Sequence, residues 1–215
     1  MNKHFIIFEN EIRKLREDKS VHGVALIGSV AYGNATEDSD LDILVLGEED
    51  RFLSKEEDGI CVEIHFQSAE TSRQKLINNP MEVYKYIYSR IAFDDGELVR
   101  MFEEAQVIYD NYQTPWKVLE GIRYWLTSTK RKLLSGMKEN NIQRVSYILS
   151  TNTWKLLEGV WAVNNKPIPP SGIAFCKSGL LTCPIENWFE ELLLGDINHR
   201  ANTMVKIIDW ICCDN

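Results

Sequence analysis

The 215-residue sequence lacks the features that mark several classes of protein. No apolar run approaches the ~20 residues of a membrane-spanning helix, and charge at Glu9 and Glu11 interrupts the N-terminal segment before a signal-peptide core can form. Cysteine occurs only five times, an odd number without C-x-x-C spacing, so we expect neither a disulfide framework nor a zinc site. These absences favour a cytoplasmic protein with no membrane partner.

A long basic tract is also missing, which argues against nucleic acid as the partner. The net charge of -8 is unevenly distributed along the chain. Residues 1–114 hold 12 Lys and Arg against 23 Asp and Glu, whereas residues 115–215 hold 12 against 9. An acidic first half is suited to holding metal ions and attracting a cationic substrate.

Apolar patterning divides the sequence at the same place. In residues 1–114, short strand-like runs alternate with helical ones: we predict strands over 24–27, 41–46, 60–66 and 107–109, helices over 8–19, 69–91 and 96–106, and an acidic loop over 47–58. In residues 115–215 only helices are predicted, over 116–137, 141–163, 185–194 and 198–213, with a loop at 167–172. The expected fold class is therefore α+β, a small mixed β-sheet with flanking helices followed by an all-α helical bundle.

One stretch of the first half carries the candidate chemistry. Gly28 and Ser29 follow the first predicted strand, where glycine allows the backbone to approach a phosphate and the serine hydroxyl can donate to it. Asp40 and Asp42 stand at the mouth of the second strand, so the pleat would put both carboxylates on one face, about 7 Å apart. Glu63, by alternation, would present a third acid to the same edge. Because adjacent carboxylates repel each other, this pattern predicts a site for a divalent cation and phosphoryl chemistry.

This arrangement resembles the signature of the polymerase β-like nucleotidyltransferase superfamily. The elements are Gly28-Ser29, ten intervening residues, Asp40-Leu41-Asp42 and then Glu63, and the resemblance covers residues 23–66. Within that superfamily the sequence is most similar to antibiotic nucleotidyltransferases, which modify aminoglycosides or lincosamides, and to minimal nucleotidyltransferases. The resemblance implies that residues 1–114 are the catalytic domain and that 115–215 are a substrate-binding domain.

The resemblance also implies roles for the individual residues. Gly28 and Ser29 would hold a nucleoside triphosphate, Asp40 and Asp42 would bind Mg²⁺, and Glu63 would be either a third metal ligand or the base. The implied reaction is an in-line transfer of a nucleoside monophosphate, AMP from ATP, to a hydroxyl of a small molecule, with release of pyrophosphate.

Two cations in the second half are further candidates. Arg123 and Lys130 fall seven residues apart on the apolar stripe of the predicted helix 116–137. They would either contact the triphosphate or pack their aliphatic stems with the charged groups in water.

Three residues of the next predicted helix, and one histidine, complete the candidate set. Tyr147, Trp154 and Glu158 share one side of helix 141–163, where they would either bind a cationic or sugar-like acceptor or, for the aromatics, belong to the core. Glu158 is the second candidate for the base. His65 lies two residues past Glu63 on the same strand face, so it would line the site or serve only in packing.

Two hypotheses follow for the function. The first is an Mg²⁺-dependent adenylyltransferase that acts on a small molecule, such as an aminoglycoside-like antibiotic, and confers antibiotic resistance. The alternative is a toxin–antitoxin-type regulatory module that binds or adenylylates a partner protein. A catalytically dead nucleotide sensor is disfavoured because every motif residue is present. The resemblance is compatible with a homodimer and leaves the preferred base of the nucleotide open.

Overall fold

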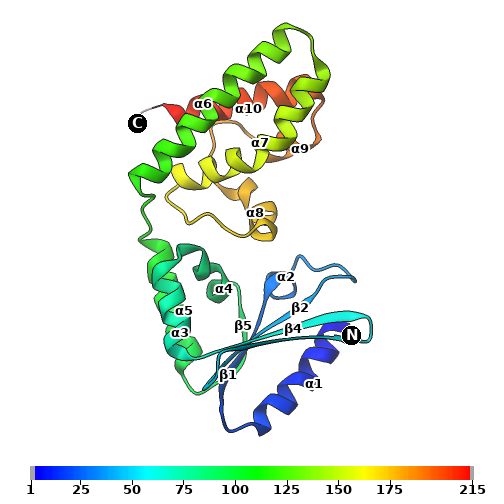
Figure 1. The fold of residues 1–215 in the computed structure, drawn as a ribbon, viewed down its shortest axis with the longest axis vertical. Coiled ribbons are helices and arrows are strands. Elements are labelled where there is room, and N and C mark those ends of the chain that lie inside the picture. Colours follow the sequence, from blue (N-terminus) through cyan, green and yellow to red (C-terminus); the bar gives the residue numbers. More distant parts are fainter. Residues whose placement is uncertain (1–2, 214–215) are drawn as a thin grey trace. The chain divides into compact units, whose positions relative to one another are not determined.

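The structure is a computed structural model that describes residues 3–213, and the chain divides into two units (Figure 1). The first unit extends to Asn111 and the second begins at Tyr112. The predicted division at residue 114 falls in the same connecting segment, between helices that end at Asp110 and begin at Trp116. No helix within residues 3–213 is both long enough and apolar enough to cross a membrane.

The first unit is built on a five-stranded sheet in the order β3-β4-β2-β1-β5. Its elements are α1 (Lys3–Glu17), β1 (Val21–Ile27), α2 (Gly28–Tyr32), β2 (Leu41–Gly47), β3 (Arg51–Glu57), β4 (Ile60–Gln67), α3 (Ala69–Asn78), a 3-10 turn η1 (Pro80–Glu82), α4 (Val83–Ile87), β5 (Arg90–Asp94) and α5 (Glu97–Asp110). Strands β2 and β4 are parallel, and the other neighbouring pairs are antiparallel. The mixed sheet confirms the predicted fold class for this part of the chain.

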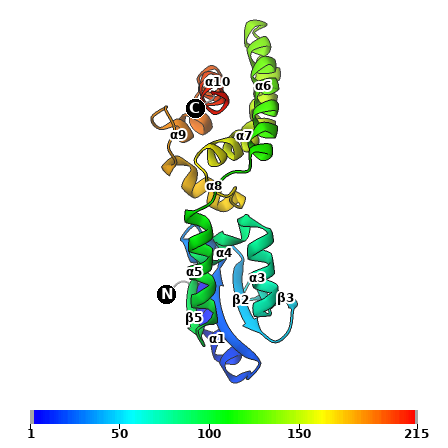
Figure 2. The same cartoon turned by 90° about the vertical axis from the view of Figure 1, so that its left-hand side faces the viewer.

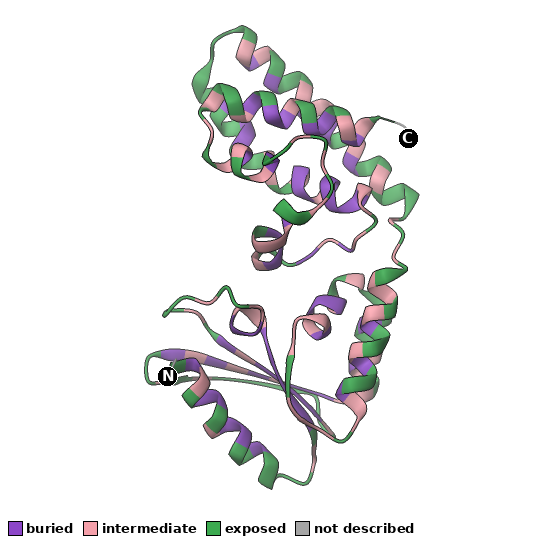
Figure 3. Cartoon of the chain, turned by 180° about the vertical axis from the view of Figure 1, so that it is seen from behind, coloured by how far each residue is buried: buried purple, intermediate pink, exposed green. Residues whose placement is uncertain are grey.

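Strand alternation gives the sheet two different faces. On one face, Ile43 and Val45 of β2 share a core with Ile7 and Phe8 of α1. The alternate residues of β2, beginning with Asp42, point to the opposite face. Helices α3 and α5 lie next to each other on that side of the sheet (Figures 1 and 2). Buried positions extend along the central strands (Figure 3). The sheet therefore separates an apolar face under α1 from the face that carries Asp42.

Three sequence-based predictions for the first unit are wrong. The segment 47–58 is not all loop, because it contains β3, an edge strand whose side chains are exposed or half-buried and so show no apolar alternation. The segment 69–91 is not one helix, because Pro80 cannot continue α3, and the chain goes on to form η1, α4 and the start of β5. Residues 107–109 belong to α5 rather than to a strand.

The error at 107–109 has a clear physical reason. Val107 and Ile108 are β-branched and favour strands locally. The same segment, however, continues a helix whose Leu98, Met101 and Ala105 are buried at helical spacing. Packing of that face outweighs the local preference for a strand.

In the part of the second unit that the structure describes, residues 112–213, helices are the only regular elements. Its elements are α6 (Trp116–Lys138), α7 (Ile142–Val163), α8 (Ser171–Lys177), a 3-10 turn η2 (Ser178–Leu180), α9 (Trp188–Leu194) and α10 (Ile197–Cys212). Leu126 of α6, Val160 of α7 and Ile208 of α10 belong to one core. At Gly159 of α7, a Cβ atom would lie 2.8 Å from Ile211 Cδ1, so this glycine lets the helices approach closely. The helical bundle is confirmed, although α8 was not predicted and α9 begins at Trp188 rather than at 185.

Candidate active site

The turn after β1 brings the backbone against a carboxylate. The chain leaves Ile27 and turns into α2 at Gly28, whose φ of +68° is a left-handed conformation that favours glycine. A Cβ atom on Gly28 would lie only 1.9 Å from Oδ2 of Asp42. Both the backbone conformation and the available space therefore require glycine here. Ser29, the next residue, is half-buried in the first turn of α2.

Asp42 and Glu63 lie directly opposite each other on the parallel strands β2 and β4. His65 follows two residues after Glu63 and therefore points to the same face. One ligand atom from each of these three side chains lies within 4.8 Å of the others, and His65 Nε2 is 3.7 Å from Glu63 Oε2. The structure thus brings together two of the three predicted acids and adds a histidine.

The electrostatics of this group are unfavourable without a bound cation. Burial, the Glu63 carboxylate and the Asp40 carboxylate together raise the pKa of Asp42 to about 6. Within residues 3–213, no lysine or arginine forms an ion pair with Asp42 or Glu63. Two carboxylates and an imidazole are suitable ligands for a divalent cation. The backbone of Gly28 approaches Asp42 so closely that a side chain at residue 28 would not fit beside it. The residues therefore fit a divalent cation.

Asp40 differs from the other two predicted acids. It is exposed, and it precedes β2, which begins at Leu41. The pleat argument that pairs Asp40 with Asp42 is therefore untested, because only Asp42 is within the strand. Among the described residues the group that could hold a metal ion contains Asp42 but not Asp40. Asp40 is close enough to raise the pKa of Asp42, and its predicted catalytic and metal-binding roles stay predictions.

Side chains from other elements influence His65 by ring contact or by charge. The Phe52 ring of β3 lies 5.0 Å from the imidazole, centroid to centroid. Burial, together with the Lys85 ammonium on α4, lowers the pKa of His65 below its ordinary value, and Lys75 on α3 acts in the same direction. The neutral imidazole is the form that can bind a metal ion. Sequence reasoning missed both lysines and Phe52, because only the folded sheet brings these segments to one face.

Comparison with known families identifies the first unit. Residues 9–102 match the family model of the nucleotidyltransferase domain. Residues 9–102 are thus a nucleotidyltransferase domain. This match confirms the resemblance to the polymerase β-like nucleotidyltransferases and supports nucleotidyl transfer as the general chemistry. The similarity to the antibiotic enzymes stays a prediction.

Other comparisons add little to this nucleotidyltransferase assignment. The chain is similar to the crystal structure of a nucleotidyltransferase-like protein from Exiguobacterium sibiricum, with 12% sequence identity and a TM-score of 0.43. That similarity covers 95% of this chain and 72% of the other chain, and at this TM-score it supports no conclusion. No curated protein matches the chain significantly.

The two predicted phosphate-binding cations lie outside the nucleotidyltransferase domain and have partners in the second unit. Arg123 donates from Nε to the Ile211 carbonyl at 2.8 Å and from a terminal nitrogen to the Cys213 carbonyl at 3.1 Å. Lys130 forms an ion pair with Asp209 of α10. These contacts account for both cations within the helical unit, and binding of the triphosphate by them stays a prediction.

The three residues predicted to bind the acceptor lie on α7. Tyr147 is 70% exposed and lines a hollow of about 380 Å³ between α6 and α7, together with Trp125 and Asn152. Trp154 is 40% exposed, so neither aromatic is a core residue. Glu158 forms an ion pair with Lys155 of the same helix, which makes it a poorer candidate for the base. Their contact with an acceptor stays a prediction.

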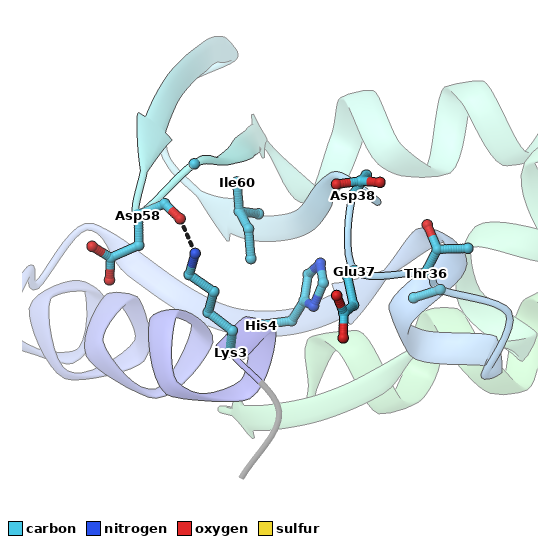
Figure 4. Close-up of a pocket in the computed structure, with 9 residues that line it drawn as sticks. Lys3, His4, Thr36, Glu37, Asp38, Asp58 and Ile60 are labelled. Carbon is cyan, nitrogen blue, oxygen red and sulfur yellow. Dashed lines mark hydrogen bonds between the residues drawn. The ribbon is translucent and has the colours of Figure 1, made fainter.

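The first unit also contains a separate cavity of about 690 Å³ (Figure 4). It is lined by the start of α1, the loop before β2 and the turn between β3 and β4, and Lys3 Nζ donates there to the Asp58 carbonyl. His4 is buried beside it, with Nε2 2.7 Å from the Ser39 carbonyl oxygen. Neither Asp42 nor Glu63 lines this cavity, which is therefore distinct from the candidate site.

Proposed function

We propose that this chain transfers a nucleoside monophosphate, AMP from ATP, to a hydroxyl group of a small molecule and releases pyrophosphate. One observation carries the proposal. Within a nucleotidyltransferase domain, Asp42 and Glu63 face each other without a lysine or arginine partner among the described residues, and the Gly28 turn touches Asp42. Placing two half-buried carboxylates side by side is costly unless the site binds a cation.

The residues at the turn and on the strands have different tasks in this proposal. Gly28 and Ser29 bind the triphosphate, because a backbone without a Cβ can approach phosphate oxygens and the hydroxyl can donate to them. Asp42 and Glu63 hold the divalent cation, for which the family resemblance implies Mg²⁺. A bound divalent cation neutralises negative charge on phosphate oxygens.

The transfer itself is an exchange of one P–O bond for another. The acceptor oxygen forms a bond to the α-phosphorus, and the bond from that phosphorus to the bridging oxygen of pyrophosphate breaks. The hydroxyl proton passes to Glu63, whose second carboxylate oxygen remains available when the first is a ligand. Base catalysis of this kind contributes roughly 10²–10⁴-fold, so loss of Glu63 would reduce the rate severely.

The acceptor is proposed to be a cationic, aminoglycoside-like antibiotic, with antibiotic resistance as the outcome. The excess of acidic residues in the first half favours a positively charged acceptor. Exposed aromatics such as Tyr147 and Trp154 on the second unit are suited to packing against sugar-like rings.

The test is a transfer assay on the full chain with ATP labelled at the α- or the γ-phosphate, a divalent cation, and aminoglycosides, lincosamides and cell proteins as acceptors. We expect the α-label on a small molecule and the γ-label in pyrophosphate, with both signals lost in Asp42→Asn. Asp38→Asn, an exposed acid of the loop before β2, is the matched control and should remain active. Label found only on a protein would favour the toxin–antitoxin alternative, and failure to bind any triphosphate in the presence of the cation would refute the enzyme.

A further inference from the structure

The donor set at the sheet edge is chemically mixed. Asp42 and Glu63 contribute carboxylate oxygens, whereas His65 contributes an imidazole nitrogen, and the three ligand atoms lie within 4.8 Å of one another. Mg²⁺ takes oxygen ligands almost exclusively and keeps several of its waters. Imidazole nitrogen is instead a good ligand for transition-metal ions, whose affinity for N and O donors rises from Mn²⁺ through Co²⁺.

The backbone fixes the relative positions of the three donors. Glu63 and His65 are two residues apart on one face of β4, and Asp42 lies opposite Glu63 in the parallel ladder with β2. Their side chains are therefore placed by a hydrogen-bonded sheet rather than by a loop. The Phe52 ring packs against the imidazole and restricts its orientation. The Glu63 and His65 side chains are each 33% exposed, which leaves an ion access from solvent.

We propose that His65 is a direct ligand of the divalent cation and that the Asp42–Glu63–His65 site consequently prefers Mn²⁺ to Mg²⁺. The proposal rests on the function proposed above only in that the same cation would serve nucleotidyl transfer. It adds an imidazole nitrogen to the carboxylate ligands expected from the sequence.

The first experiment measures binding rather than activity. The full chain, freed of metal with a chelator, is titrated with Mn²⁺ and with Mg²⁺ by calorimetry, and the Mn²⁺ complex is then studied by pulsed electron paramagnetic resonance. We expect one Mn²⁺ site that binds at least about 10-fold more tightly than Mg²⁺. The pulsed spectrum should show coupling between Mn²⁺ and a directly bound ¹⁴N nucleus.

Three variants separate direct ligation from an indirect effect. His65→Asn should lose the nitrogen coupling and weaken Mn²⁺ binding by about 10- to 100-fold, with a smaller loss for Mg²⁺. His65→Asp, which makes the donor set all oxygen, should also lose the coupling but retain Mg²⁺ binding. The matched control is His22→Asn, because His22 also lies next to a carboxylate, with Nδ1 3.0 Å from Asp95 Oδ2, but outside the site. His22→Asn should leave both the coupling and the affinities unchanged.

The results can refute His65 as a ligand without refuting the proposed function. Mn²⁺ bound without nitrogen coupling, or equal losses of Mn²⁺ and Mg²⁺ affinity in His65→Asn, would overturn His65 as a ligand even if ATP were still consumed. Nitrogen coupling in the wild type that disappears in His65→Asn would support the inference even if no nucleotide were transferred. Thermal melts of each variant establish that it is folded before binding is compared.

Discussion

Two acidic side chains of the first unit, Glu11 and Asp42, are withdrawn from solvent in different surroundings, and their pKa values are displaced in opposite directions. Glu11 on α1 is buried but is held by Lys14 and Lys55, the latter at 2.8 Å, so that despite its burial its pKa is lowered. Asp42 has no such partner among the described residues, and burial beside Glu63 raises its pKa. The fold neutralises the first carboxylate and leaves the second to be neutralised from outside.

The second unit extends the contrast. Several of its charged side chains are paired with each other, as in Lys155 with Glu158 and Arg144 with Glu139. Such pairs are explained by the helical bundle alone. A carboxylate whose pKa is displaced by an acidic neighbour is, in contrast, a candidate functional group with a stated physical cause. The most useful experiments therefore change either the Asp42 site or one of the paired cations of the second unit.

Among the variants outside the acidic pair itself, the largest effect is expected at Gly28. In Gly28→Ala the new methyl group would collide with the Asp42 carboxylate, so the acid would be displaced. We expect transfer to fall at least about 100-fold, the cost of a misplacement of ~1 Å at a catalytic centre. Gly33→Ala is the control, because Gly33 also has a positive φ, +83°, but open space around it. Equal losses of transfer in both variants would show that backbone strain, not the approach to Asp42, is responsible.

A smaller effect is expected on the pH dependence of stability. The folded-state pKa of Asp42, about 6, lies above its ordinary value of 3.8, so the folded protein holds this proton more tightly. The free energy of unfolding should therefore fall as the pH rises from 3.8 through about 6, and the loss should be complete above that pH.

Asp42→Asn should abolish this loss in the metal-free protein. At pH about 7.5 the variant should be more stable than the wild type by about 1–2 kcal/mol, after allowance for solvent screening, and near pH 4 the two should be alike. Thermal and urea melts in the presence of a chelator measure the difference. A variant that is less stable at both pH values would mean that the Asp42 carboxylate stabilises the fold.

Arg123 tests whether a cation of the second unit is structural. Arg123→Met removes its hydrogen bonds to the carbonyls of Ile211 and Cys213 at the end of α10. The loss should cost about 1 kcal/mol of unfolding free energy, while KM for ATP stays constant. The exposed Arg131, on the same helix, is the control. An increase in KM for ATP without a change in stability would instead place Arg123 at the triphosphate.

The smallest effect is expected at Lys130. Its side chain is 30% exposed and that of its partner Asp209 is 52% exposed, so the pair should contribute less than about 1 kcal/mol and weaken with salt. A double-mutant cycle with Lys130→Met and Asp209→Asn measures the coupling. A large rise in KM for ATP in Lys130→Met alone would revive its predicted contact with the nucleotide.

From the sequence alone, some residues of the site and most elements of the fold can be predicted, but not all of them. Asp42 and Glu63 could be paired because each follows the period of two in an apolar strand, and this period survives in the parallel register. Asp40 could not be placed, because the start of a strand is the least certain part of a pattern. Strand β3 carries no apolar alternation because it lies at the exposed edge of the sheet.

Contacts between distant segments are beyond the reach of such patterns. Phe52 and Lys85 approach His65 only because β3 pairs with β4 and because α4 lies near the same face of the sheet. Likewise, the ion pair of Lys130 with Asp209 depends on how α10 packs on α6. Sequence spacing indicates that a cation lies on the apolar stripe of a helix, but it does not indicate which residue pairs with that cation.

The central claim is that the Asp42–Glu63 pair exists to bind a divalent cation. It is tested most directly by calorimetric titration of Mn²⁺ into the metal-free full chain of the wild type, Asp42→Asn and Asp38→Asn. We predict a single site in the wild type and in Asp38→Asn, and no binding in Asp42→Asn. Binding to Asp42→Asn as tight as to the wild type would contradict the account.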